Sequence, residues 1–458
     1  MKNFINGNKI LDLLERTERP SNYQVEKLVE KSLRLKGLSP EDTAVLLNCE
    51  DDVLLNSIFT AAKQIKESIY GNRLVLFAPL YLSNRCVNDC LYCGFRQGIS
   101  NNKKCLLSND EIREETQALI SQGHKRLLLV SAEDPAVDID YLEGAIKTVY
   151  DTKEGNGSIR RLNVNVAPMG VKDFRRLKDT GIGTYQLFQE TYHSDTYTTM
   201  HPSGPKSDYL KRLYACDLAQ KAGIDDVGIG ALFGLYNYKF EVLALLFHSM
   251  HLEDTFGVGP HTISVPRLEP SEGSNIASRP PSHVSDNELK KIIAVLRLAV
   301  PYTGIILSTR ESAGLRDELF YLGVSQISAG SRTVPGSYSS DKEAQGQFSI
   351  SDERSLSEVI EELATSGFIP SFCTSCYRSG RTGENFMDLA KPGDIKNFCQ
   401  PNALLTFEEY LLDYNPKLAQ KIKALITSEI HKIPDPDIRK LTSGKMESLV
   451  QGERDLYF

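Results

Sequence analysis

RLVLFAPLYLSNRCVNDCLYCGFR (residues 73–96) decides the fold, because an apolar run is followed at once by three closely spaced cysteines. The run over residues 73–82 is typical of a buried strand. Asn88, Asp89 and Gly94 disfavour a helix across the cysteine segment. The cysteines are therefore expected in a loop directly after this strand.

Seven further apolar runs follow along the chain and alternate with amphipathic stretches. We expect strands at 73–82, 126–133, 162–168, 184–190, 226–235, 262–268, 304–310 and 324–330. Eight strands alternating with helices imply an α/β fold, a parallel (β/α)8 barrel of the TIM type. The cysteine loop then lies at the catalytic end of the barrel, and the long loop 271–286 is expected there as a lid or binding loop.

Other patterns flank the barrel on both sides. Residues 6–70 carry apolar positions at helical spacing, broken by Pro20 and Pro40. A second group of cysteines lies near the C-terminus. We expect three domains: an N-terminal helical cap over 1–72, the barrel over 73–335 and a C-terminal domain with the second cysteine group over 336–458.

Strand alternation predicts an open lumen. In the fifth strand Gly228 and Gly230 point inward and the apolar residues point toward the helices. Asn165 in the third strand and Ser308 and Arg310 in the seventh also point inward. Such a lining is unlike the filled core usual for this barrel, so we expect a cavity.

Cys86, Cys90 and Cys93 form a C-x3-C-x2-C triad, which predicts a metal site with one open position. The alternatives are one face of a helix and zinc, whose usual motifs supply a fourth ligand that this segment lacks. With Tyr92 before its last cysteine, the triad resembles the signature of radical S-adenosylmethionine (SAM) enzymes. The resemblance implies a [4Fe-4S] cluster whose unique iron is chelated by SAM, the source of a 5'-deoxyadenosyl radical.

Cys373, Cys376 and Cys399 form a second triad with C-x2-C-x22-C spacing. Taken alone, this spacing leaves an iron–sulfur cluster and a structural zinc, with a fourth ligand such as His431, equally open.

The two triads together resemble the HydG family of tyrosine lyases that mature [FeFe]-hydrogenase. Five more stretches are similar to its motifs: YQLFQETYH (185–193), MHPSGPKSDY (200–209), AGIDDVGIGALFGL (222–235), GPHTISVPR (259–267) and STRESAGLRDEL (308–319). The resemblance implies radical cleavage of L-tyrosine to p-cresol and dehydroglycine, and then formation of CO and cyanide at an auxiliary [4Fe-4S] cluster for the hydrogenase H-cluster. In the family this cluster is held by three cysteines and joined to an additional iron with a histidine ligand.

The resemblance also suggests which residues bind SAM. The expected contacts are Tyr92, Ala132, Glu133, Asn165, Glu190 and Arg212. In SAED (131–134), Ser131 and Ala132 replace the glycines of a Gly-Gly-Glu-like segment, and the plain alternative for Glu133 is a capping carboxylate. Arg212 is expected to pair with the methionyl carboxylate, although a solvated helix arginine is the default.

Ser308, Arg310 and Glu190 are the expected catalytic residues. A buried arginine needs an anion, and the carboxylate of substrate tyrosine is the preferred partner of Arg310. His251 and His261 are the candidates for the additional iron. Both are expected between the fifth helix and the sixth strand, away from the first triad, and His261 is preferred because it directly precedes an inward-facing strand. Most single histidines at such places are inert.

Composition narrows the classes of partner. A formal charge of −7 argues against nucleic acid, and no apolar run approaches the roughly 20 residues of a membrane span. We expect a cytoplasmic location or another reducing, low-oxygen compartment. The expected ligands are SAM and L-tyrosine. The expected partners are an electron donor such as ferredoxin or flavodoxin, and other hydrogenase maturases.

Two rival functions stay open. The thiamine-pathway tyrosine lyase shares the barrel and the first reaction, but its family lacks the C-terminal triad. An iron–sulfur electron carrier or a metal-stabilised binding protein would not cleave SAM. If the C-terminal domain plugs the far end of the barrel, strands of six or seven residues separate the two clusters by roughly 20 Å, and the lumen is a conduit between them.

Overall fold

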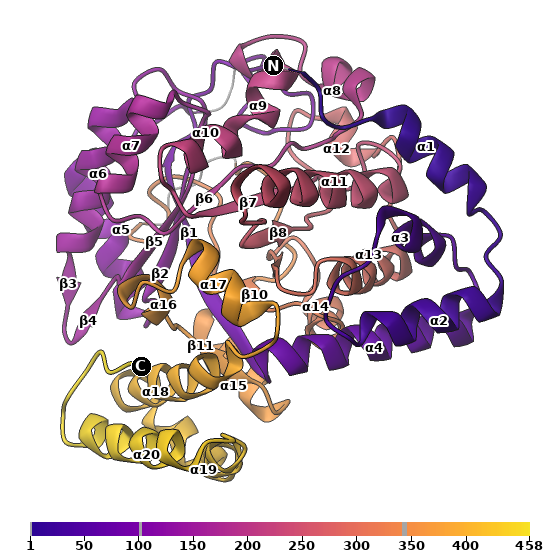
Figure 1. The fold of residues 1–458 in the computed structure, drawn as a ribbon. Helices are drawn as coiled ribbons and strands as arrows, with labels where there is room; N and C mark the ends of the chain where they lie inside the picture. Colours follow the sequence, from indigo (N-terminus) through magenta and orange to yellow (C-terminus); the bar gives the residue numbers. More distant parts are fainter. Residues whose placement is uncertain (1, 100–102, 341–345) are drawn as a thin grey trace.

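A closed parallel barrel forms the centre of the protein in the computed structural model, which describes residues 2–99, 103–340 and 346–458 (Figure 1). Its strands are β1 (Arg73–Ser83), β2 (Arg126–Ser131), β5 (Arg161–Asn165), β6 (Thr184–Gln186), β7 (Asp226–Gly230), β8 (Thr262–Ser264), β9 (Gly304–Leu307) and β10 (Gln326–Ser328). They pair in this order, and β10 pairs with β1 to close the barrel. The predicted (β/α)8 barrel is confirmed, with all eight expected strands.

Every strand after the first ends sooner than its apolar run predicts. β6 ends at Gln186, and beyond it Glu190 forms only an isolated bridge with Ala231. Glu190 has a φ of +69°, in the left-handed region, which costs a residue other than glycine about 1–3 kcal/mol. Regular pairing stops where the backbone turns side chains toward the cavity, and apolar content does not reveal that point.

Helices surround the barrel. Those between strands are α5 (Asn109–Ser121), α6 (Ile139–Asp151), α7 (Val171–Asp179), α8 (Ser194–Met200), α9 (Tyr209–Leu213), α10 (Ala215–Lys221), α11 (Tyr238–Phe256), α12 (Asn275–Ser278), α13 (Asp286–Ala299) and α14 (Ala313–Phe320). A short 3-10 turn, η1 (Pro205–Ser207), precedes α9, and β3 (Lys153–Glu154) and β4 (Gly157–Ser158) form a small hairpin.

Four N-terminal helices cover one side of the barrel, as the helical periodicity predicts (Figure 1). They are α1 (Gly7–Arg16), α2 (Asn22–Ser32), α3 (Pro40–Leu47) and α4 (Asp52–Tyr70). α4 packs along α13, and α1 and α3 pack on α11. α2, α3 and α4 begin at side-chain caps, for example the reciprocal capping box of Ser39 and Asp42.

The C-terminal region joins the barrel through a ninth strand that the sequence did not predict. β11 (Ile369–Ser371) pairs in parallel with Arg73–Val75 of β1. The helices of this region are α15 (Leu356–Thr365), α16 (Ser375–Arg378), α17 (Gly383–Ala390), α18 (Lys396–Tyr414), α19 (Pro416–His431) and α20 (Pro436–Val450). They gather at the end of the barrel where β1 begins (Figure 1).

The inward glycine face of β7 is confirmed. A Cβ at Gly230 would lie 2.7 Å from the ring of Phe188 and 2.9 Å from the Ser264 carbonyl oxygen, so glycine makes room for the aromatic side chain. Val227 and Ile229, on the other face, are fully buried against the helices.

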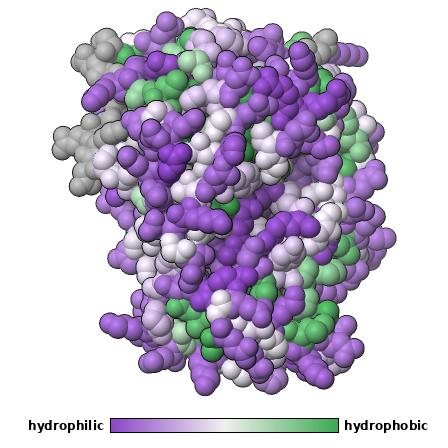
Figure 2. Space-filling model, turned by 90° about the vertical axis from the view of Figure 1, so that its left-hand side faces the viewer, coloured by the Kyte–Doolittle hydropathy of each residue, from purple (hydrophilic) through white to green (hydrophobic). Residues whose placement is uncertain are grey.

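The face of the molecule seen in Figure 2 is mainly hydrophilic, with scattered apolar residues. No helix in the described part of the chain is long and apolar enough to cross a membrane.

Candidate functional site

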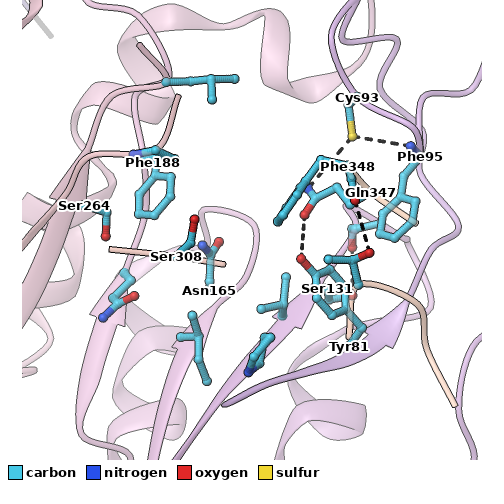
Figure 3. A pocket seen from close by; sticks show the side chains of 18 of the residues that line it. Tyr81, Cys93, Phe95, Ser131, Asn165, Phe188, Ser264, Ser308, Gln347 and Phe348 are labelled. Atoms are coloured by element: carbon cyan, nitrogen blue, oxygen red, sulfur yellow. Dashed lines mark hydrogen bonds between the residues drawn. The ribbon is translucent and has the colours of Figure 1, made fainter. Parts of the chain in front are cut away.

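A cavity of about 200 Å³ lies at the C-terminal ends of the barrel strands, next to the first cysteine triad (Figure 3). Its lining includes every residue predicted for this end of the barrel: Cys86, Tyr92, Cys90, Cys93, Ala132, Glu133, Asn165, Glu190, Arg212, Ser308 and Arg310. Strands far apart in sequence thus bring the three thiols, the cations and the carboxylates to one place.

The first triad lies in an irregular loop after β1, so the alternative of one helix face is wrong. Burial raises the pKa of Cys90 to about 12 and also raises the pKa of Cys93. Burial thus favours the protonated form of both thiols, and a bound cation would favour the thiolates. The backbone N–H of Phe95 donates to the Cys93 Sγ at 3.4 Å.

The first triad places three thiols at one cavity, and its segment of the sequence supplies no fourth Cys or His. Within the part of the chain that the structure describes, no three His, Cys, Asp or Glu side chains are arranged to hold a single metal ion. A tetrahedral zinc needs four ligands converging on one point, whereas a [4Fe-4S] cluster takes its thiolates at separate iron atoms. Three thiols at one cavity are a donor set that would suit such a cluster with one iron position open.

Glu190 is the centre of a buried charge network. Its Oε1 lies 2.6 Å from Lys206 Nζ and 3.3 Å from Arg212 Nη2. Burial acts to raise the pKa of Glu190, but Lys206 and Arg212 outweigh it and hold that pKa below its ordinary value. Two basic side chains therefore face one carboxylate in this network.

Asn88 connects the cysteine loop to this network. Its Nδ2 donates to Glu133 Oε2 at 2.6 Å, and its Oδ1 accepts from the Lys206 backbone N–H at 2.8 Å. The Ala132 carbonyl accepts from the Ser131 hydroxyl at 2.8 Å. Sequence reasoning missed Asn88 and Lys206 as site residues, although both lie inside stretches that it singled out.

In the part of the chain that the structure describes, Arg310 forms no direct ion pair with a carboxylate, and Glu190 and Glu269 act on its charge only from a greater distance. Among the described residues its polar side-chain contact is one long hydrogen bond, 3.4 Å, from Nη1 to the Arg267 carbonyl oxygen. Glu311 instead binds Arg267, which also pairs with Asp286 at 2.8 Å. A structural pairing of Arg310 with Glu311 is therefore absent, and its charge is available to an anion in the cavity.

Two further segments lie near the first triad. In the predicted loop 271–286, Ser274 Oγ donates to the Leu91 carbonyl at 2.6 Å, which confirms its place at this end. The second segment is residues 346–349, of which Gln347 and Phe348 line the cavity. Sequence reasoning missed this second segment, because its polar, glycine-containing sequence carries no strand or helix signal.

The second triad lines a separate pocket at the N-terminal ends of the strands. The pocket is lined by Tyr70, Arg73, Val75, Arg126, His261, Gly304, Ser325, Gln326, Cys373, Thr374, Ser375, Cys376, Tyr377, Phe386 and Cys399. Arg73 Nη2 donates to Cys399 Sγ at 3.3 Å, and Arg126 donates to the Cys373 carbonyl. Burial raises the pKa of Cys376 to about 12. Buried guanidinium groups beside three thiols suit an anionic metal cluster.

The structure brings His261, and not His251, to this pocket. His261 Nε2 lies 3.3 Å from the Tyr377 hydroxyl. His251 lies within α11 rather than after it, stacked on Phe4 with ring centroids 3.6 Å apart and bound to Asp217 at 2.8 Å. His431, the zinc alternative, lies at a surface hollow on α19.

The two pockets share the barrel lumen. Val75 lines the second pocket while Phe77 and Tyr81 line the first, all on β1. At about 3.3 Å per residue, Val75 and Tyr81 lie roughly 20 Å apart along the strand. Gln326 and Ser328 on β10 likewise line the second and first pockets. The linings of the two pockets therefore come within two residues of each other on both β1 and β10, although the pockets lie at opposite ends of the barrel.

Comparisons with known proteins agree with this geometry. A model of the Radical SAM superfamily matches residues 80–246, and a model of the Biotin and Thiamin Synthesis associated domain matches residues 264–369. A crystal structure of HydG, a maturase of the [FeFe]-hydrogenase, is 51% identical with a TM-score of 0.97 and full coverage of both chains. The chain belongs to the HydG family.

Further relatives place this HydG-family chain among radical SAM enzymes. HydG from Carboxydothermus hydrogenoformans is 41% identical, with a TM-score of 0.82 and coverage of 96% of this chain and 99% of that chain. The 2-iminoacetate synthase of Salmonella typhimurium is 34% identical over 75% of this chain and 89% of its own length. The expected radical SAM enzyme is confirmed, and the superfamily implies a [4Fe-4S] cluster and SAM.

Proposed function

We propose that this HydG-family protein cleaves the Cα–Cβ bond of L-tyrosine to p-cresol and dehydroglycine, and then forms CO and cyanide bound to iron for the [FeFe]-hydrogenase H-cluster. The observation that carries the proposal is the guanidinium of Arg310, which lies with Ser308 in the cavity of the first triad and forms no direct ion pair with a described carboxylate. It provides a site for the carboxylate of an amino-acid substrate next to the radical source.

The residues of the first site have separable tasks. Cys86, Cys90 and Cys93 would hold the [4Fe-4S] cluster, which with SAM supplies the 5'-deoxyadenosyl radical when bound. Arg212 is placed to bind the methionyl carboxylate, and the Ala132 carbonyl and Glu133 to accept from the methionyl amine. Tyr92, Asn165 and Glu190 would complete the SAM contacts.

The cavity also suits the rest of tyrosine. Arg310 can bind a carboxylate through two N–H groups, and the Ser308 hydroxyl lies on the same strand end. Phe77, Leu128 and Ile306 supply apolar walls deeper in the barrel, where a phenol ring is shielded from water. Exclusion of water also protects a radical from side reactions.

The second pocket would hold an auxiliary [4Fe-4S] cluster on Cys373, Cys376 and Cys399, with His261 as the ligand of an additional iron. Arg73 and Arg126 offset negative charge there, which favours retention of an anionic product such as cyanide. The lumen would pass dehydroglycine from the first site to the second.

We also propose the limits of the three domains: the N-terminal helical cap ends at residue 72, and the barrel ends at residue 335.

The same proposal includes the physiological setting. A reducing, low-oxygen compartment such as the cytoplasm would preserve both clusters. Ferredoxin or flavodoxin would donate electrons, and other hydrogenase maturases would receive the product.

The decisive experiment separates the two sites in one variant. Reconstituted Cys376→Ala should retain p-cresol formation but lose CO and hydrogenase activation, because only the second site loses a thiolate. Cys105→Ser, a cysteine outside both triads, is the matched control and should retain all activities.

Other results would favour other functions. Normal CO from a Cys376→Ala protein that lacks its second cluster would contradict hydrogenase maturation. Release of p-cresol and dehydroglycine without CO from the unaltered protein would favour 2-iminoacetate synthase activity. This is the activity for which the 34% identical relative from Salmonella typhimurium is named. Joint loss of p-cresol, CO and solubility would indicate structural zinc at the second triad.

A further inference from the structure

Residues 346–349 form one wall of the first cavity, and Phe348 lies against Arg310. The Cζ atom of Arg310 is 3.4 Å from the centroid of the Phe348 ring. Both side chains line the cavity. The Arg310 guanidinium lies over the ring and forms no direct ion pair with a described carboxylate, although Glu190 and Glu269 act on its charge from a greater distance.

The backbone around Phe348 is held by several other elements. The Gln347 carbonyl accepts from the Gly94 N–H at 3.1 Å and from the Ser271 hydroxyl at 3.1 Å. The Ser349 N–H donates to the Pro270 carbonyl at 2.9 Å. These contacts fix Phe348 relative to both the cysteine loop and the loop after β8.

The Gln347 side chain adds a polar link on the same side of the cavity. Its Oε1 accepts from the Tyr81 hydroxyl at 2.8 Å, and its Nε2 lies 3.9 Å from Cys93 Sγ. Figure 3 shows Gln347, Phe348, Tyr81 and Cys93 gathered at one side of the pocket, with Phe188 and Ser264 at the other. The segment is therefore an integral part of the wall.

We propose that Phe348 is a positioning residue for Arg310. Stacking on the ring restricts the guanidinium to one plane and leaves its N–H edge free to bind a planar carboxylate bidentately. Without the aromatic face, Arg310 keeps its charge but samples more rotamers, and binding has to offset that freedom. This inference deepens the proposed function and rests on it, because the carboxylate is that of substrate tyrosine.

The test compares Phe348→Leu with Phe348→Tyr in the reconstituted, SAM-loaded enzyme. Phe348→Leu should raise the KM for the substrate L-tyrosine by about five- to tenfold. Its kcat should stay within about twofold, and the electron paramagnetic resonance spectrum of the SAM-bound first cluster should be unchanged. Phe348→Tyr keeps an aromatic face and should keep the KM close to that of the unaltered enzyme. The affinity for L-tyrosine, measured by calorimetry without turnover, should likewise be lower in Phe348→Leu than in Phe348→Tyr or the unaltered enzyme.

A double-mutant cycle tests whether Phe348 acts through Arg310. If it does, Phe348→Leu should change KM little in an Arg310→Lys background. Additive losses, an unchanged KM in Phe348→Leu, or a matching rise in KM for Phe348→Tyr would overturn the inference. If Phe348→Leu fails to take up iron, Phe348→Met provides the same comparison with a flexible side chain.

Failure of the inference is distinct from failure of the proposed function. An unaltered enzyme that makes no p-cresol contradicts the function itself. Normal p-cresol formation with no effect of Phe348→Leu on tyrosine affinity contradicts only the role of Phe348.

Discussion

Arg73, the first residue of β1, donates a hydrogen bond from Nη2 to the Sγ of Cys399 at 3.3 Å. Burial raises the pKa of Cys399, while Arg73 acts to lower it. The barrel sheet thus contributes a cation directly to the second triad, and its influence on a metal cluster there can be measured.

Arg73→Met should make the second cluster harder to reduce, because it removes a positive charge and a hydrogen bond from a thiolate ligand. A charge-assisted hydrogen bond contributes about 1.5–3 kcal/mol. Redox titration followed by electron paramagnetic resonance should show a more negative potential for the second cluster alone. Arg175→Met, at an exposed position of α7, is the control, and equal shifts in both variants would contradict the assignment.

Arg310→Lys should weaken tyrosine binding by about 1–3 kcal/mol although the charge is retained, because a point charge replaces a bidentate donor. Calorimetry with tyrosine in the presence of SAM measures the loss. Affinity for SAM should stay unchanged as an internal control. An unaltered tyrosine affinity would place the substrate carboxylate elsewhere.

Alanine at Cys86, Cys90 or Cys93 should abolish p-cresol and 5'-deoxyadenosine together, because each variant loses a ligand of the cluster that supplies the radical. Product analysis after reduction with SAM and tyrosine checks this. Iron analysis of each variant should still show the second cluster. Continued p-cresol formation in any of them would refute the role of the first triad.

Glu241 predicts a pH dependence of stability. It is fully buried in α11 and accepts from the Thr191 hydroxyl and, at 2.9 Å, from the Tyr192 N–H. Burial raises its pKa from 4.5 to about 7. The folded state therefore holds a proton that the unfolded state has released, and this stabilisation is lost as pH rises from about 4.5 through about 7, on the order of 3 kcal/mol.

Glu241→Gln should remove that dependence. Unfolding of the metal-free chain at pH 5.5 and pH 8 should show the variant gaining stability relative to the unaltered chain at the higher pH. Glu26→Gln, at an exposed position of α2, should show no such trend. A stability difference independent of pH would mean that Glu241 is ionised throughout.

The strands and the first site were predictable because their signals are local. Periodicity placed Ser308 and Arg310 inward, and the short spacing from Cys86 to Cys93 keeps the triad in one loop. His251 was not placed correctly because α11 is apolar on nearly all sides. The pattern of apolar residues in this helix therefore does not show which side faces the barrel. Phe348 and Lys206 reach the cavity through tertiary contacts that no local pattern encodes.

The pairing of β11 with β1 has a consequence for the order of events during synthesis. Arg73 and Ile369 are ladder partners about 300 residues apart in the chain, and Val75 pairs with Gln326, which is about 250 residues distant. Closing such separations carries a large entropic cost before any contact is gained, and sheets of this kind fold slowly. At elongation rates of 5–20 residues per second, β1 waits roughly 15–60 seconds for these partners to emerge from the ribosome. During that time its apolar edge is exposed, which makes the nascent chain a candidate substrate for chaperones.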